Sequence, residues 1–204
     1  TTYRKRHLVV FGEYLPFAQW LPVLRKLIPI PGDFTPGDRF VPFELSGAAK
    51  AKLSVLICFE DVFPHLVRDY VGADTDFLLN LTNDGWFGEG AAQWQQAVGA
   101  VFRAVENGVP LIRCTNNGLT CWIDSHGVIR EILGGEGKAV YAPGFMLAKI
   151  PLSTSGQGHE STFYNRHGDW FGWVCLGLSL VAVVVRIVHN RPSPPANTFR
   201  DSKG

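Results

Sequence analysis

Residues 53–60 have the sequence LSVLICFE, a short apolar run that ends in a cysteine and a glutamate. Aliphatic and β-branched residues in a run of this length predict a buried strand, here one that ends at Cys58. The next residues, DVFP at 61–64, predict the start of a helix that extends to residue 70, with Asp61 as its N-cap. A thiol at such a turn lies near backbone N–H groups and the positive end of a helix dipole, which favour the thiolate. Cys58 is therefore the candidate nucleophile, with a buried core cysteine as the alternative.

Two charged residues near the N-terminus are candidates for assisting this nucleophile. Lys5 precedes a short strand-like run at 8–11, and Glu13 follows that run. A nucleophilic thiol needs a base that takes its proton and a cation that stabilises the oxyanion. Lys5 and Glu13 supply such groups if the fold brings them next to Cys58. The alternative is a solvated basic segment, because residues 4–6 are all basic.

A third segment, DFLLNLTNDGWFG at residues 76–88, joins an apolar run to a polar loop that contains glycine. The run predicts a buried strand at 77–81, and the loop is expected to expose Trp86 and Phe87. Binding groups tend to collect on loops of this kind. The segment therefore predicts substrate contacts, with core packing of Trp86 as the alternative.

Together these segments resemble the nitrilase superfamily, whose members use a Glu-Lys-Cys triad. Its lysine motif is matched by RKRHL at 4–8 followed by Glu13, and its nucleophile motif by CFE at 58–60. A closer likeness is to the membrane branch of the superfamily, the apolipoprotein N-acyltransferases. The motifs that carry this likeness are TNDGWFG at 82–88, WQ at 94–95 and RCTNNG at 113–118. The resemblance extends from Tyr3 to the apolar segment near the C-terminus.

The resemblance implies a two-step acyl transfer that uses no metal and no other cofactor. The Cys58 thiolate attacks a phospholipid, which is the acyl donor, and forms a thioester. The acceptor is the N-terminal amine of a diacylglyceryl-modified apolipoprotein. The implied catalytic residues are Cys58, Lys5 and Glu13, and the implied substrate-binding residues are Phe59, Glu60, Asn83, Trp86 and Phe87. Lys5 stabilises the oxyanion together with a backbone N–H near Phe59, while Glu13 and Glu60 position Lys5.

The sequence also departs from the family pattern. In the family, the triad glutamate that acts as general base lies upstream of the lysine motif, and Glu13 is a different, accessory glutamate. Because the sequence starts at Thr1, we expect it to be the C-terminal part of a longer enzyme and to be inactive in isolation. Val10 stands where the family usually has proline. Two alternative functions remain, a soluble nitrilase-type amidase that uses water as its second nucleophile, and a catalytically dead, membrane-anchored remnant.

Composition narrows the range of partners. The chain has 204 residues, enough for one sizeable domain, and a net charge of +1. So small a net charge argues against a nucleic-acid partner. We also expect the protein to be a monomer. The four cysteines lack metal-ligand spacing. Cys114 and Cys121 flank an Asn-Asn-Gly turn and are predicted to be two buried thiols, and Cys175 lies in an apolar run where it should be inert.

That apolar run, WFGWVCLGLSLVAVVV at 170–185, contains no charged residue. Extended past Arg186 to residue 188, it is long enough for a transmembrane helix, which needs about 17 to 25 residues. Tryptophans at its start and basic residues after its end predict a cytoplasmic tail at 189–204. The expected location is the inner membrane of a bacterium, with the catalytic domain on the periplasmic side. A buried core helix is the alternative.

Elsewhere the chain alternates predicted strands and helices, which is typical of an α/β domain. A helix is predicted at 93–107, ended by Gly108, with a buried face made of Ala97, Ala100, Val101, Ala104 and Val105. Strands are predicted at 109–113 and 119–123 around a turn at 116–118, and further strands at 128–133 and 144–151.

The resemblance refines this fold class to the C-terminal half of a nitrilase-like α-β-β-α sandwich, followed by one transmembrane helix. The expected organisation is a partial catalytic domain at 1–158, a linker at 159–169, a transmembrane helix at 170–188 and a tail at 189–204. A Ser/Gly-rich stretch at 153–158 leads into the linker.

Overall fold

A computed structural model describes residues 2–18, 20, 22–28, 34–47, 50–88, 90–134, 141, 143–152 and 159–190. The chain divides into two compact units, one at residues 1–168 and one at residues 169–204. The predicted Ser/Gly-rich stretch at 153–158 and the tail from residue 191 onward lie outside the described residues.

The first unit is built on a six-stranded mixed sheet whose strands follow the chain order from β1 to β6. The strands are β1 (Phe43–Leu45), β2 (Ala51–Ile57), β3 (Phe77–Asn83), β4 (Leu111–Asn116), β5 (Cys121–Ile123) and β6 (Ile129–Ile132). The central strands β2, β3 and β4 are parallel, and the outer pairs are antiparallel. The strands predicted at 53–57, 77–81, 109–113, 119–123 and 128–133 are confirmed in type, with end points that differ by a few residues.

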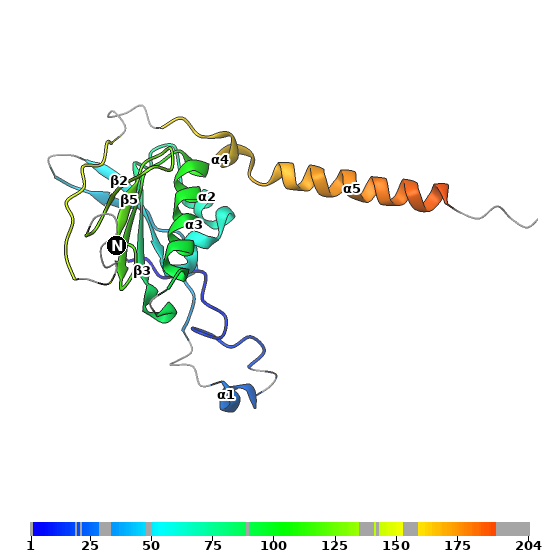
Figure 1. Ribbon diagram of the computed structural model, residues 1–204, viewed down its shortest axis with the longest axis horizontal. Coiled ribbons are helices and arrows are strands. Elements are labelled where there is room, and N and C mark those ends of the chain that lie inside the picture. The colour runs from blue at the N-terminus through cyan, green and yellow to red at the C-terminus, as the bar shows by residue number, and fades with distance from the viewer. Residues whose placement is uncertain are drawn as a thin grey trace, which may run out of the picture. The chain divides into compact units, whose positions relative to one another are not determined.

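Parallel neighbours need crossover connections, and helices supply them here. The first crossover contains the 3-10 helix η1 (Cys58–Val62) and α2 (Pro64–Tyr70), and the second contains η2 (Asp84–Phe87) and α3 (Ala92–Asn107). Figure 1 shows α2 and α3 side by side on one face of the sheet. A short helix α1 (Leu24–Leu27) lies in the N-terminal segment.

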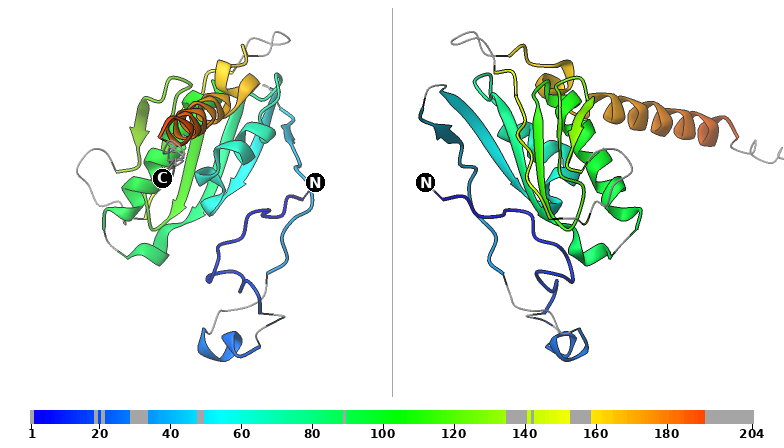
Figure 2. Two further views of the ribbon diagram at one scale, coloured as in Figure 1. Left: turned by 90° about the vertical axis from the view of Figure 1, so that its right-hand side faces the viewer. Right: turned by 60° about the vertical axis from the view of Figure 1, so that its left-hand side comes forward.

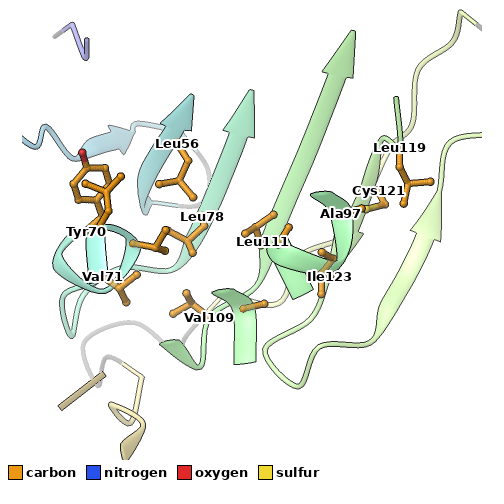
Figure 3. Close-up of a cluster of buried hydrophobic side chains, with 14 residues drawn as sticks. Leu56, Tyr70, Val71, Leu78, Ala97, Val109, Leu111, Leu119, Cys121 and Ile123 are labelled. Carbon is orange, nitrogen blue, oxygen red and sulfur yellow. The ribbon is translucent and has the colours of Figure 1, made fainter. Parts of the chain in front are cut away.

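The main hydrophobic core lies between the sheet and these helices. Leu56, Leu78 and Leu111 come from the three parallel strands, and all are fully buried. They pack against Tyr70 and Val71 at the end of α2 and against Ala97 on α3, as Figure 3 shows. Burying such aliphatic side chains contributes about 1.5 to 3 kcal/mol each. This core fixes the parallel strands against α2 and α3.

A second, smaller cluster lies on the opposite face of the sheet. Leu53, Val55 and Phe77 are buried there, and Ile150 and Leu152 pack against them. The strand predicted at 144–151 is wrong, because residues 143–152 are described as an extended segment without regular structure. The alternating apolar residues of this segment cover the face of the sheet instead of joining its edge. Figure 2 shows this part of the chain passing along the sheet.

The helix predicted at 93–107 is confirmed within one residue, and Gly108 ends it in a left-handed conformation with φ of 69°. Its predicted buried face is partly wrong. Ala97, Ala100 and Ala104 are buried, but Val105 is 45% exposed and Val101 is only partly buried. Polar side chains complete the inner face, namely Gln93, Gln96, Arg103 and Asn107. Their partners lie outside the sheet: Gln93 donates to the Gly88 carbonyl, Arg103 donates to the Val62 carbonyl, and Asn107 accepts from the Asn165 side chain.

The prediction that Asp61 caps a helix is also wrong. Phe63 is the residue that precedes α2, and Pro64 occupies its first turn. Asp61 lies inside η1 and is fully buried. Its carboxylate is held by an arginine from the sheet rather than by helix N–H groups.

Part of the predicted linker at 159–169 forms α4 (Phe163–His167), whose N-cap Thr162 accepts a hydrogen bond from the Asn165 amide. The Asn165 side chain donates to the Asn107 oxygen at 2.9 Å, and the Thr162 hydroxyl donates to the Glu106 carbonyl. These bonds attach α4 to the end of α3.

The second unit contains α5 (Trp170–His189), which matches the helix predicted at 170–188. By length and composition it is apolar enough to cross a membrane, and none of it is buried within the described structure. Nearly every large side chain along it is exposed within this unit.

Candidate active site

Cys58 lies where β2 ends and η1 begins, as the sequence predicted. Its backbone has a φ of 54°, in the left-handed region that non-glycine residues rarely occupy. Its carbonyl accepts a hydrogen bond of 3.2 Å from the Asn80 side chain, which is fully buried on β3. The side chain of Cys58 is only partly buried. The thiol therefore lies on a sharp, strained turn at the rim of the sheet and not in the apolar interior.

The parallel strands bring other polar groups to the same edge. Ile57 is paired with Leu81, and Asn83 with Asn116, so β2, β3 and β4 all end there. Asn83 caps η2, where its side-chain oxygen accepts from the Gly85 amide at 3.1 Å. Because carboxyl ends of parallel strands commonly form ligand sites, this edge is the candidate site of the unit.

Glu60 is fully buried two residues after Cys58, and it binds the N-terminal segment. Its carboxylate accepts from the Arg6 amide at 2.6 Å and from the His7 amide at 3.2 Å. The Tyr3 hydroxyl donates to it at 2.8 Å, and the Ile57 amide completes the set at 2.8 Å. Four neutral donors thus satisfy a buried carboxylate. They also fix the segment that carries Lys5 against the turn that carries Cys58.

Lys5 and Glu13 are brought together. The Lys5 ammonium donates to both carboxylate oxygens of Glu13, at 2.8 and 2.7 Å, and the Lys5 side chain is only 9% exposed. Lys5 is therefore not part of a solvated basic run. Its ammonium pairs with Glu13 and not with the Cys58 thiol in this structure.

The strand-like run predicted at 8–11 is wrong, and the actual conformation explains the Lys5–Glu13 pair. The Val9 carbonyl accepts from the Gly12 and Glu13 amides at 3.2 and 2.8 Å, which closes a tight turn. The Val9 amide donates to Glu13 Oε2 at 2.8 Å. A strand would have carried Glu13 away from Lys5, whereas this turn folds it back.

The aromatic residues that follow Asn83 are exposed at the same edge. Trp86 is 67% exposed and Phe87 is 47% exposed, so Trp86 does not pack in the core. Phe59 lies beside Cys58, where its ring makes an edge contact with Phe63 at 5.3 Å between centroids. A cavity of about 940 Å³ opens nearby between the β4 end and residues 143–148, with Gly85 and Asn116 in its lining.

A buried cluster of charges that sequence reasoning missed lies below this edge. Arg113 on β4 is fully buried and donates to Asp61 at 2.7 Å and to Asp84 at 2.8 Å. Both carboxylates are also fully buried. Burial raises the pKa of Asp61 from its usual 3.8 to about 6, against the opposing effect of Arg113. The sequence did contain a signal for this cluster, namely an arginine inside an apolar strand, because such an arginine needs buried partners.

The cysteines differ from their prediction as two buried thiols. All are free, and Cys121 is buried, but Cys114 is exposed. Neighbouring residues of a strand point to opposite faces of the sheet. Arg113 is paired with Cys121 and points with it to the buried face, so Cys114 points to the other face. Burial raises the pKa of Cys121 to about 11, so it is a poor nucleophile. In the described part of the chain, no group of three or more His, Cys, Asp or Glu side chains could hold a metal ion.

Comparison with known proteins bears on this site. Residues 1–156 match the carbon-nitrogen hydrolase family. The apolipoprotein N-acyltransferase of Geobacter metallireducens is 41% identical over 189 residues, which are 93% of this chain and 33% of that protein. The apolipoprotein N-acyltransferase of Haemophilus influenzae is 37% identical over 164 residues, 74% of this chain and 30% of that protein. The predicted resemblance is thus confirmed, and the chain spans about a third of the length of these relatives.

Among solved structures, the NitN amidase from Neterenkonia sp. AN1 shares 24% sequence identity with a TM-score of 0.43. The alignment covers 66% of this chain and 47% of the amidase. So low a score supports no conclusion about the activity of this chain.

Proposed function

The chain belongs to the carbon-nitrogen hydrolase family, and from that premise we propose that it carries the nucleophile of an apolipoprotein N-acyltransferase. The reaction moves a fatty acyl chain from a phospholipid to the N-terminal amine of a diacylglyceryl-cysteine in an apolipoprotein. Relatives named for this activity, aligned over most of the chain, support the proposal. The observation that carries it is the docking of the Lys5 segment, through buried Glu60, onto the strained turn that holds Cys58.

The first step forms a thioester. Cys58 Sγ, once deprotonated, attacks the ester carbonyl carbon of the phospholipid, and a C–S bond forms. The tetrahedral intermediate collapses as the C–O bond breaks, and the leaving alkoxide takes the proton to give a lysophospholipid. Glu13 is engaged by Lys5 and by the Val9 amide, which makes it a poor candidate for the base. The family resemblance assigns that role to a glutamate upstream of the lysine motif.

Two groups are suited to stabilise the oxyanion of this intermediate. A residue that follows a nucleophile on a sharp turn presents its N–H toward the reacting carbonyl, and Phe59 holds that position here. Lys5 supplies a positive charge that Glu13 holds in one orientation. Losing one such donor typically slows catalysis by about 10²- to 10³-fold.

The second step releases the acyl group to the acceptor. The amine of the diacylglyceryl-cysteine attacks the thioester carbonyl, the C–N bond forms, and the C–S bond breaks. The amine proton returns to the Cys58 thiolate, which restores the enzyme. The thioester intermediate divides one difficult transfer into two steps, each with a lower barrier.

A membrane location fits the lipid substrates. We propose that α5 crosses a bacterial inner membrane, with its basic C-terminal end on the cytoplasmic side and the sheet domain in the periplasm. Exposed Trp86 and Phe87 would contact acyl chains. Each methylene that leaves water contributes about 0.8 kcal/mol, so apolar side chains at this edge favour lipid binding.

The test uses the membrane protein as its gene encodes it, incubated with phospholipid and analysed by mass spectrometry. Cys58→Ala should abolish the acyl adduct, whereas Cys114→Ala, which removes the exposed thiol of the sheet domain, should retain it. Lys5→Arg should lose most activity, because a planar guanidinium does not replace a compact ammonium. An acyl adduct that persists in Cys58→Ala would reject the assignment, and near-normal turnover of Lys5→Arg would reject the role of Lys5.

A further inference from the structure

We propose that Arg113 is a positioning residue for acyl transfer, because its guanidinium holds the Cys58 turn and the Asn83–Phe87 loop at a fixed separation. It does so by binding one carboxylate from each, Asp61 and Asp84. The effect on lipid turnover rests on the proposed function, but the effect on the Cys58 turn does not.

The connections that this role requires are short. Asp61 lies three residues after Cys58 within the same 3-10 helix, and Asp84 is the first residue of η2. Arg113 Nη1 donates to Asp61 Oδ2 at 2.7 Å, and Arg113 Nη2 donates to Asp84 at 3.1 and 2.8 Å. One side chain on β4 therefore joins the two turns that follow β2 and β3.

The chemistry of the guanidinium suits this task. Its planar fork presents several N–H donors in a fixed geometry, so it can bind two carboxylates at a set distance. A lysine ammonium carries the same charge at a single point, on a flexible stem. All three side chains are fully buried, so solvent neither screens these contacts nor substitutes for them.

Neighbouring residues fix both arms of this bridge. The Thr82 hydroxyl donates to Asp84 at 3.0 Å, and a Cβ atom at Gly118 would overlap the Asp84 carboxylate. The glycine in the Asn-Asn-Gly turn thus leaves the space that Asp84 occupies. On the other arm, Asn80 is the strand neighbour of Arg113 and donates to the Cys58 carbonyl at 3.2 Å. The bridge and the nucleophile turn are parts of one buried polar layer.

The decisive experiment is a double-mutant cycle with Asp61→Asn and Asp84→Asn in the full protein. The rate constant for acylation of Cys58 by phospholipid is measured in single turnovers by mass spectrometry. Each single variant should lose about tenfold, because either change replaces one ion pair of the guanidinium by a weaker contact with a neutral amide. The double variant should lose about the same tenfold and not the roughly hundredfold expected of independent sites. KM for phospholipid should stay unchanged in Asp61→Asn.

Arg113→Lys tests the geometry of the bridge while keeping its charge. It should slow acylation by about 10- to 100-fold, which is the cost of misplacing a reacting group by roughly 1 Å. The matched control is Leu111→Ala, two residues earlier on the same face of β4 and equally buried, which removes packing but no charge. It should lower the melting temperature at least as much as Arg113→Lys, yet leave the acylation rate within about twofold of the wild type.

A second measurement needs no lipid. The rate of alkylation of Cys58 by iodoacetamide is followed against pH at the level of the Cys58 peptide. Arg113→Lys and Asp61→Asn should each displace this profile from that of the wild type, and Leu111→Ala should superimpose on the wild type. If the wild type forms no thioester, the proposed function fails, and alkylation alone decides the role of Arg113. Additive losses in the cycle, or Leu111→Ala as slow as Arg113→Lys, would overturn the proposal.

Discussion

Glu60 and Asp61 are neighbours in the sequence, and both are fully buried, but they fix opposite sides of the Cys58 turn. Glu60 accepts neutral donors from the outer side, where the Tyr3 hydroxyl and the Arg6 and His7 amides belong to the N-terminal segment. Asp61 binds the cationic Arg113 on the inner side, and Arg113 belongs to β4, two strands along the sheet from β2.

The difference lies in how each burial is compensated. Hydrogen bonds compensate the burial of Glu60, whose carboxylate accepts from four donor groups. Asp61 shares its cation with Asp84, so burial still raises the pKa of Asp61 to about 6. The contact of Glu60 with the N-terminal segment thus depends on hydrogen-bond geometry, and the contact of Asp61 with Arg113 depends on charge balance. Substitutions should separate these two effects.

The largest loss should come from Arg113→Ala. It leaves two buried carboxylates without their cation, so we expect the free energy of unfolding to fall by about 3 to 5 kcal/mol. Chemical denaturation in detergent solution measures it. The matched control is Arg130→Ala, whose side chain is 53% exposed in its pair with Asp124 and should lose no more than about 1 kcal/mol. Equal losses in the two variants would mean that burial does not strengthen the contacts of Arg113 with its two carboxylates.

Glu60→Gln should have the next largest effect. The amide nitrogen would face donors in place of a carboxylate oxygen, so at least one buried N–H or O–H loses its acceptor, at a cost of about 2 to 3 kcal/mol. Hydrogen exchange should report faster opening at the Arg6 and His7 amides than elsewhere in the sheet. Uniform acceleration over all strands would contradict a local role for Glu60.

Tyr3→Phe should cost less, about 1.5 kcal/mol, because it removes the hydrogen bond to the Glu60 carboxylate and the weaker one shared with the Tyr70 hydroxyl. Tyr70→Phe is its partner variant, since the Tyr70 hydroxyl contacts the Tyr3 hydroxyl at 2.8 Å and not Glu60. It should cost less than Tyr3→Phe when both are measured by thermal unfolding. The reverse order would mean that Tyr70 anchors the segment.

The smallest effect should be a dependence on pH that belongs to Asp61. Its folded pKa of about 6 is above its usual 3.8, so the folded state binds the proton more tightly than the unfolded state. The stabilising contribution of this proton is complete below pH 4 and disappears as the pH rises through about 6. The difference in unfolding free energy between wild type and Asp61→Asn should therefore change over this interval. A constant difference would show that Asp61 is ionised throughout.

Much of the candidate site could be predicted from local sequence. The strand that ends at Cys58 follows from its apolar run, and the exposure of Trp86 and Phe87 follows from their polar, glycine-containing loop. The turn at 9–13 was missed because Val9, Val10 and Phe11 have strand propensity, while the bonds to the Val9 carbonyl and Glu13 impose a turn. The polar part of the inner face of α3 was missed because apolar periodicity takes no account of buried polar side chains whose partners lie elsewhere in the fold, such as Asn107 with Asn165.

The sequence by itself determined strands β2 to β6, the long helices α3 and α5, and the identity of the candidate nucleophile, because these depend on neighbours along the chain. Only the tertiary structure decided what holds that nucleophile in place. Glu60 reaches residues more than fifty positions away, and Asp61 reaches Arg113 over a similar interval. The physical reason is that a buried charge must be compensated, and its partners are chosen by proximity in space, which periodicity and propensity do not record.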